Sequence, residues 1–196
     1  MIETKADLNA YIAADALACG RSSRRPRLIG DDVWRFQLSL RKHEYWHNRK
    51  AKAGALEKLL ILPALAYRKM EFARRSARLN YTIPLNVFDR GLSIAHPGAI
   101  VVNASARVGK NCRIHECVTI GSTNGCKQSA VIGDNVFLAS GARIIGDISI
   151  ADDVAIGANA VVIRSITEPG TTWAGVPARM VSRKDSHSNL NPRLFE

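Results

Sequence analysis

Aliphatic residues recur at every sixth position through the second half of the chain. The series begins at Val102, ends at Val162 and is interrupted only at Cys126. A second set of small or apolar residues stands four positions after each member of the first set, from Ala106 to Ile166. An α-helix requires apolar residues about 3.6 positions apart, and a hairpin sheet alternates with a period of two. A six-residue period instead predicts a parallel β-helix, in which each inward aliphatic residue stacks on the one a full coil away.

The front of the chain follows a different pattern. Helices are expected over residues 1–20, 31–48 and 54–79, with Asp31 and Asp32 as an N-cap signal and Pro63 kinking or splitting the last helix. We expect a helical region over 1–83, a β-helix over 84–182 and a polar, frayed tail over 183–196. The segment 121–130 keeps the repeat count but lacks the aliphatic residue, so it is expected to leave the β-helix as a loop.

Positive charge is concentrated in the front half. The chain has a net charge of +11, of which +9 falls in residues 1–90 and +2 in residues 91–196. An anionic substrate, an acidic membrane surface and an ordinary solvated face all fit this charge. No nucleic-acid partner is expected, because the sequence contains no recognised nucleic-acid-binding motif. The polar start lacks a signal-peptide pattern, and the apolar run Leu59 to Ala66 is short and contains a proline, so the expected location is cytoplasmic.

Metal binding is not expected from the sequence. The cysteines show no C-x-x-C spacing, and we interpret them as small buried apolar residues; they are Cys19, Cys112, Cys117 and Cys126. The string HEYWH, with His43, Glu44 and His47, matches a zinc-protease pattern. No third ligand accompanies it, so a helix surface packed against the β-helix is the preferred interpretation.

Two histidines are candidates for chemistry. His96 falls in the phase that carries aliphatic residues elsewhere, just before the regular coils. A neutral imidazole is suited to act as a general base near neutral pH, although a structural histidine fits the same position. His115 lies close to one coil further on and is expected to stack near His96.

A second candidate region lies near the end of the repeats. Its basic residues would suit a phosphorylated adenosine, or they form an ordinary basic terminus; they are Arg164, Arg179, Arg183 and Lys184. Small residues leave room for a slim ligand against the backbone, and these are Ala139, Ala158 and Ala160.

The motifs GLSIAHPGAIVV, VGKNCRIHECVTIG, GANAVV and AGVPAR resemble those of the hexapeptide-repeat acyltransferases. The resemblance covers about residues 84–182, and it is nearest to serine O-acetyltransferases and to capsular or exopolysaccharide O-acetyltransferases. It implies a mainly β fold, a left-handed parallel β-helix with an N-terminal α-helical region. It also implies acetyl-CoA as co-substrate, no metal, and a homotrimer or a pair of trimers with sites between neighbouring chains. His96 matches the catalytic base, and the coenzyme A contacts match Ala139, Ala158, Arg164 and Arg179.

Several positions depart from the serine acetyltransferase pattern. That pattern has an aspartate before the base, a carboxylate fifteen positions upstream and Arg-His-Pro after the loop. Here Ala95, Tyr81 and the run Gln128-Ser129-Ala130 stand instead. Because charged contacts for a small zwitterion are lost, we expect a sugar hydroxyl of a capsular or exopolysaccharide as acceptor, with peripheral contact to a membrane-linked glycan. Serine O-acetylation for cysteine biosynthesis and a non-catalytic β-helix scaffold are the alternatives.

The remaining site residues are assigned less sharply. Acceptor contacts are expected from Glu44, His47, His115 and Ser129. The group that orients His96 is left open between Glu116, Asp89 and Glu44. Cys117 as an acyl-carrying nucleophile is an alternative without a paired base.

Overall fold

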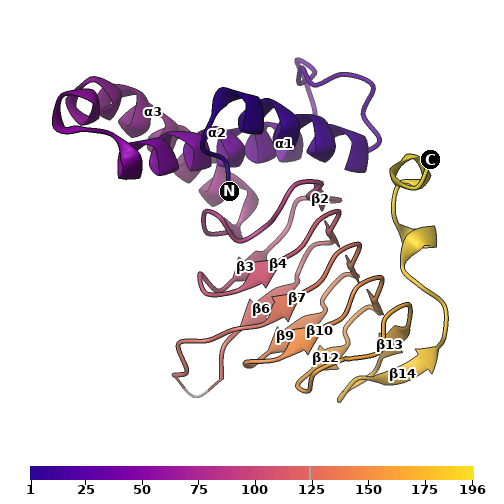
Figure 1. Cartoon of the computed structure of the whole chain (residues 1–196). Helices are drawn as coiled ribbons and strands as arrows, with labels where there is room; N and C mark the ends of the chain where they lie inside the picture. Colours follow the sequence, from indigo (N-terminus) through magenta and orange to yellow (C-terminus); the bar gives the residue numbers. More distant parts are fainter. Residues whose placement is uncertain (124) are drawn as a thin grey trace.

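A computed structural model describes residues 1–123 and 125–196 and confirms the parallel β-helix. Stacked coils form a column, and a layer of helices covers the end at which the column begins (Figure 1). Within the described residues the strands form three sheets, in the orders β1-β3-β6-β9-β12, β10-β7-β4 and β14-β13-β11-β8-β5-β2. Every strand pair is parallel except β13 with β14. The hexad period therefore identified the architecture correctly.

The strands are short because each wall of a coil is only one hexapeptide long. The first sheet contains β1 (Tyr81–Thr82), β3 (Ile100–Val102), β6 (Thr119–Gly121), β9 (Arg143–Ile145) and β12 (Val161–Val162). The second contains β4 (Arg107–Val108), β7 (Val131–Ile132) and β10 (Ser149–Ile150). The third contains β2 (Ser93–Ile94), β5 (Arg113–Ile114), β8 (Phe137–Leu138), β11 (Ala155–Ile156), β13 (Thr172–Ala174) and β14 (Arg179–Ser182).

The interior of the β-helix is a dry aliphatic column. The inward residues of the hexad series are almost completely buried; they include Ile114, Ile120, Leu138, Ile144 and Ile156. The small residues of the second set are equally buried at the corners, among them Ala106, Ala130, Ala142 and Ala160. Since neighbouring coils stack inward residues directly on one another, each wall is held by backbone hydrogen bonds and by close aliphatic contact.

One corner of the column is built from asparagines in the left-handed conformation. Asn111, Asn135 and Asp153 have φ values of 58°, 56° and 60°. Asn111 Nδ2 donates to Asn135 Oδ1 at 2.8 Å, and Asn135 Nδ2 donates to Asp153 Oδ1 at the same distance. Asparagine and aspartate tolerate this backbone conformation better than other residues with a Cβ. These hydrogen bonds therefore satisfy the polar side chains of residues that the left-handed turn conformation favours.

The coils are not all of equal length. Ser149 pairs with Val131, eighteen positions earlier, whereas Phe137 pairs with Arg113, twenty-four positions earlier. The coil that contains residues 121–130 therefore has one hexad more than the regular coil of eighteen residues. The hexad position of Cys126 falls in this extra segment and is not part of a wall. The loop predicted over 121–130 is confirmed for residues 122–123 and 125–130, whereas Gly121 still belongs to β6; Asn124 lies outside the described residues.

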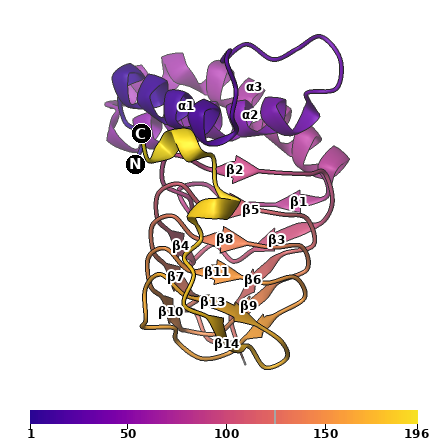
Figure 2. The same ribbon diagram turned by 90° about the vertical axis from the view of Figure 1, so that its right-hand side faces the viewer.

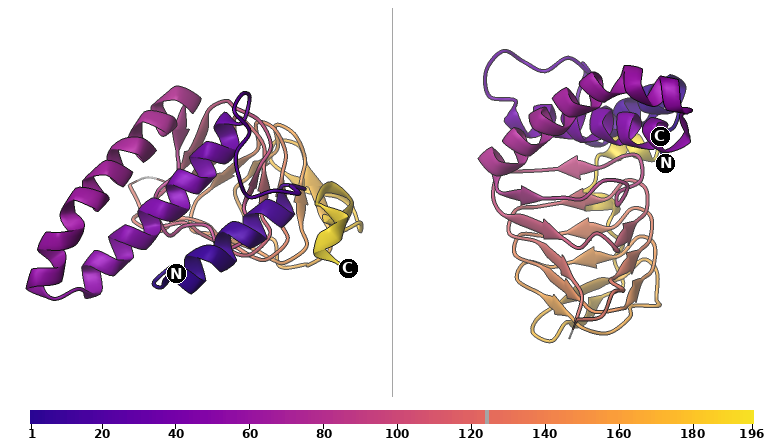
Figure 3. Two further views of the ribbon diagram at one scale, coloured as in Figure 1. Left: turned by 90° about the horizontal axis from the view of Figure 1, so that it is seen from above. Right: turned by 90° about the vertical axis from the view of Figure 1, so that its left-hand side faces the viewer.

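The helical layer consists of α1 (Lys5–Ala18), α2 (Asp32–Lys52) and α3 (Ala55–Leu79). Helix α3 continues through Pro63, so the expected split is wrong. Asp31 precedes α2 but makes no side-chain capping bond; its carboxylate accepts from Arg21 Nη2 at 2.6 Å instead. Seen from above, α2 and α3 extend beyond the column (Figure 3). No helix in the described part of the chain is long and apolar enough to cross a bilayer.

A buried ion-pair network joins the helices to the first coil. Arg41 is 1% exposed and donates to Asp15 at 2.8 Å and to Glu44 at 3.0 Å. It also donates to the carbonyls of Phe88 and Asp89 at 2.9 and 2.7 Å. Buried charges persist only when paired and hydrogen-bonded, and here the partners come from α1, from α2 itself and from the segment before β2. Arg41 thereby fixes α1 and α2 on the entrance to the β-helix.

The tail is folded back along the column and is not frayed. It contains the 3-10 turns His187–Asn189 and Pro192–Leu194, and its end lies beside α1 (Figure 2). Asn191 Nδ2 donates to the carbonyl of Leu17, and Leu190 is 6% exposed. The expectation of a loose polar tail is therefore wrong. The interpretation of the cysteines as buried holds for Cys112, whereas Cys117 and Cys126 are exposed.

Replacing Arg41 with alanine is expected to lower the free energy of unfolding by about 3–5 kcal/mol, because two buried carboxylates lose their counter-charge. Arg49→Ala removes the exposed pair of Arg49 with Glu57 and should cost no more than about 1 kcal/mol. Denaturant unfolding of both variants measures the difference. Equal losses would show that the Arg41 network does not anchor the helices.

Candidate functional site

His96 lies on an exposed corner, just after strand β2. Counting in sixes gives His96 the phase of the inward aliphatic residues, where the imidazole is either buried or exposed at an edge; in the structure Ile94 occupies the inward slot and His96 is exposed. The reason is that Ile94 pairs with Ile114, twenty positions later, so this coil has two more residues than a regular one. The extra residues move the imidazole outside. The Tyr81 hydroxyl donates to the His96 carbonyl at 2.7 Å and holds this irregular turn.

His115 and Glu116 lie beside His96, one coil further along. The His96 and His115 ring centroids are 5.5 Å apart with the rings nearly perpendicular. One nitrogen from each histidine and one Glu116 oxygen all lie within 4.8 Å of one another. The predicted stacking of the two histidines is therefore confirmed. The other candidates for orienting His96 are engaged elsewhere: Glu44 pairs with Arg41, and Asp89 accepts from the Arg90 amide.

The electrostatics of this group favour an ionised carboxylate at Glu116 and a neutral imidazole at His115. A hydrogen bond from Ser140 lowers the pKa of Glu116, and the two histidines lower it further. Burial lowers the pKa of His115, and Arg113 adds to this effect. The Ser140 hydroxyl is 3.4 Å from His115 Nδ1. His115 Nε2 and Glu116 Oε2 are buried and have no hydrogen-bond partner among the described residues, so both are available to a bound molecule.

The same three side chains could also share a metal ion, since two imidazoles and a carboxylate are ordinary ligands. General-base catalysis, by contrast, needs only an imidazole that accepts a proton. Cys117 lies next to Glu116 in the left-handed conformation, with φ of 62°, and is exposed.

One corner of the column carries both the histidines and the small residues. His115, Ala139 and Gly157 each follow directly after the inward aliphatic residue of β5, β8 or β11. Their amides donate to the next coil, at 3.0 Å for Ala139 to Ile156 and 2.8 Å for Gly157 to Trp173. Because these strands pair in one sheet, their carboxyl ends form a continuous edge. This edge runs from His96 toward Ala158 and the last coil.

The end of the column contains a cavity of about 360 Å³ lined by Arg164, Arg179 and Trp173. Arg164 and Arg179 take part in no ion pair with the described residues. Of the basic residues predicted to cluster here, Arg183 and Lys184 do not line the cavity. Arg183 lies 3.7 Å from Glu168, and the Lys184 carbonyl accepts from Thr172. The structure thus brings together two of the four predicted cations.

The expected acceptor residues lie in different places. Glu44 is 2% exposed and accepts from Arg41 and the Asn86 amide, so the expectation that it contacts an acceptor is wrong. His47 lies on α2, away from the histidine pair, and lines another cavity. Ser129 is buried, and its hydroxyl has no partner among the described residues. The sequence did not lead us to predict Ser140, which lies beside His115. Its place on the same corner of the column as His115 could have indicated this contact.

Known proteins share sequence with parts of this chain. Residues 129–164 match the family model described as bacterial transferase hexapeptide (six repeats). The matched residues lie within the β-helix, from just before β7 to just after β12. It is 35% identical to serine acetyltransferase from Staphylococcus xylosus over 116 residues, which is 55% of this chain and 53% of that protein. It is 36% identical to the Escherichia coli K12 serine acetyltransferase over 105 residues, or 53% of this chain and 38% of the relative.

Solved serine acetyltransferases share the fold. The Brucella abortus structure aligns with a TM-score of 0.62 and 22% identity, covering 92% of this chain and 70% of that one. A serine acetyltransferase complex with CoA aligns with a TM-score of 0.64 and 22% identity, covering 90% of this chain and 71% of that one. The fold is accordingly a left-handed β-helix with an N-terminal helical region, as the resemblance implied. The chain spans about half the length of the first curated relatives that it matches, 53% for the Staphylococcus xylosus protein.

Tyr81→Phe is expected to lower the free energy of unfolding by about 1 kcal/mol, because the His96 carbonyl loses its donor. The matched control is Tyr67→Phe, since Tyr67 is 55% exposed on α3 and should change stability by less than about 0.5 kcal/mol. Denaturant unfolding measures both variants. A neutral Tyr81→Phe substitution would contradict a role for this bond in holding the turn.

Proposed function

We propose that the chain is an acetyl-CoA-dependent O-acetyltransferase with His96 as its general base. The observation that carries this proposal is an edge that begins at an exposed imidazole beside Glu116 and runs toward the last coil, where Arg164 and Arg179 line a cavity. A thioester laid along this edge has its phosphates near the arginines and its reactive carbonyl toward the histidines. Small side chains at Ala139 and Ala158 keep the edge open.

The proposed reaction is direct transfer. His96 accepts the proton of the acceptor hydroxyl as the oxygen attacks the thioester carbonyl. The tetrahedral intermediate then collapses, the C–S bond breaks, and the leaving thiolate takes the proton from the imidazolium. Glu116 stabilises the imidazolium between these steps. Such general-base assistance is worth about 10²–10⁴ in rate.

The acceptor we propose is the hydroxyl of serine. The similarity to serine acetyltransferases from several bacteria supports serine over the capsular sugar expected from the sequence. The exposed position of His96 also supports a site completed by a neighbouring chain, which is the homotrimer implied by the resemblance.

His96→Ala is expected to reduce thioester consumption with serine by about 10²–10⁴, because the acceptor hydroxyl loses its base. Release of the free thiol from acetyl-CoA measures this rate. His187→Ala is the matched control, since His187 lies in the tail and pairs with Asp153. An unchanged rate in His96→Ala would remove the assigned base, and faster turnover of a capsular oligosaccharide than of serine would refute the proposed acceptor.

Arg164→Gln is expected to raise the dissociation constant of coenzyme A about tenfold, since one charge-assisted contact to phosphate is lost. Titration calorimetry measures the change. Arg183→Gln removes the same charge nearby without touching the cavity and should leave the affinity within about twofold. Equal effects of the two substitutions would contradict coenzyme A binding in this cavity.

A further inference from the structure

The helical layer contains a cavity that the proposed reaction does not use. It has a volume of about 610 Å³ and lies between α2 and α3, with Leu85 from the connector after β1 in its wall. This volume is within the range of ordinary small-molecule sites. The lining from α2 comprises His43, His47, Lys50 and Ala51, and that from α3 comprises Lys58, Leu65 and Lys69.

The polar groups of this lining are all basic, and it has no carboxylate. The spacing explains the clustering: positions 43, 47 and 50 share one face of α2, and positions 58, 65 and 69 share one face of α3. Two helices that present such faces to each other concentrate positive charge in a partly enclosed space. Positive charge lining a concave, low-dielectric wall attracts anions.

Most of the cations that these two helices carry outside the cavity are ion-paired in the described part of the chain. Arg49, Lys52 and Arg68 each pair with a glutamate, and Arg75 and Arg78 are paired as well. Lys50, Lys58 and Lys69 make no ion pair within the described part of the chain. The three lysines of the lining thus have no counter-charge among the described residues, and the same is true of Arg35, Lys42 and Arg74 outside the lining.

A buried histidine supplies an independent observation. His43 is 7% exposed, and its Nδ1 atom has no hydrogen-bond partner among the described residues. Burying such a polar atom without a partner is costly, and a bound ion or water that supplies the missing hydrogen bond is one explanation for it. Burial lowers the pKa of His43, and His47 and Lys69 lower it further, which reflects the positive surroundings.

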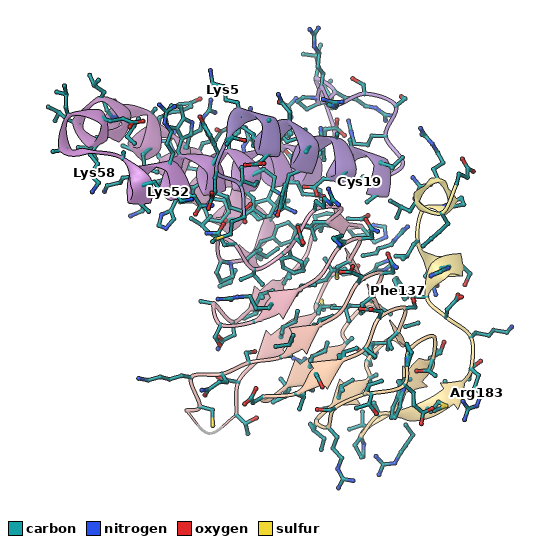
Figure 4. All side chains as sticks on the ribbon, in the orientation of Figure 1. Lys5, Cys19, Lys52, Lys58, Phe137 and Arg183 are labelled. Carbon is teal, nitrogen blue, oxygen red and sulfur yellow. The ribbon has the colours of Figure 1, made fainter. Side chains whose placement is uncertain are left out.

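We propose that this cavity binds a phosphate group carried on a molecule with an apolar part. Lysine ammonium groups and an imidazole N–H bind phosphate oxygens, and Leu65, Leu85 and Ala51 offer apolar surface beside them. The cavity is larger than inorganic phosphate needs, so the phosphate belongs to a larger molecule. Lys58 lies on the part of the layer that overhangs the column (Figures 3 and 4), which leaves the site accessible from outside.

Titration calorimetry on the full chain without acetyl-CoA tests the site independently of catalysis. The probes are inorganic pyrophosphate and a short-chain phosphatidic acid kept below its micelle concentration, with short-chain phosphatidylcholine as the comparison lacking a net charge. We expect saturable binding of both anions and little binding of phosphatidylcholine. Tighter binding of phosphatidic acid than of pyrophosphate is the expected result, and equal binding of the two would overturn the assignment of an apolar part to the ligand.

The double substitution Lys58→Gln/Lys69→Gln should raise both dissociation constants about tenfold or more. Lys52→Gln is the matched control, because Lys52 ends α2, pairs with Glu3 and does not line the cavity; it should change them less than about twofold. Far-UV circular dichroism verifies that each variant is folded, and Lys50→Gln provides a second test. Absence of saturable binding, equal weakening by Lys52→Gln, or loss of binding in Arg164→Gln would overturn the site.

Discussion

The stacking of one coil on the next is the constraint on which the rest of the structure depends. Backbone amides of each coil donate to carbonyls of the following coil, as Ala139 does to Ile156, and inward aliphatic residues follow the same register. Since this register repeats, a residue at a given corner has its counterpart directly above and below. Chemical groups that are far apart in the sequence are thereby aligned along an edge without any loop to position them.

The irregular first coil is what places a reactive side chain on the outside of the regular β-helix. Its two extra residues move His96 out of the inward slot while leaving Ile94 in the column. Asp15 accepts from the amides of Gly91 and Leu92, so the helical layer holds the strand that leads to the imidazole. The buried pair of Asp15 with Arg41 therefore contributes to the geometry of the site as well as to the attachment of the helices.

The sequence predicted most of the fold because the hexad pattern follows directly from packing. Every inward aliphatic position and the small residues at the corners could be assigned, and the break at Cys126 indicated the loop. It did not predict the phase of His96, since an insertion of two residues is visible only through strand pairing. The group that orients His96 could be narrowed to three candidates but not chosen, because Glu116 and His96 are twenty positions apart and meet only through the pairing of β2 with β5.

The final hairpin has a consequence for association. A β-helix that stopped at a regular coil would present unpaired amides and carbonyls to any similar end, and the copies could join into fibres. Here β14 turns back antiparallel on β13, and the helices cover the opposite end. Both termini of the column are thus shielded from end-to-end polymerisation, which leaves the flat side walls as the surfaces through which copies can associate.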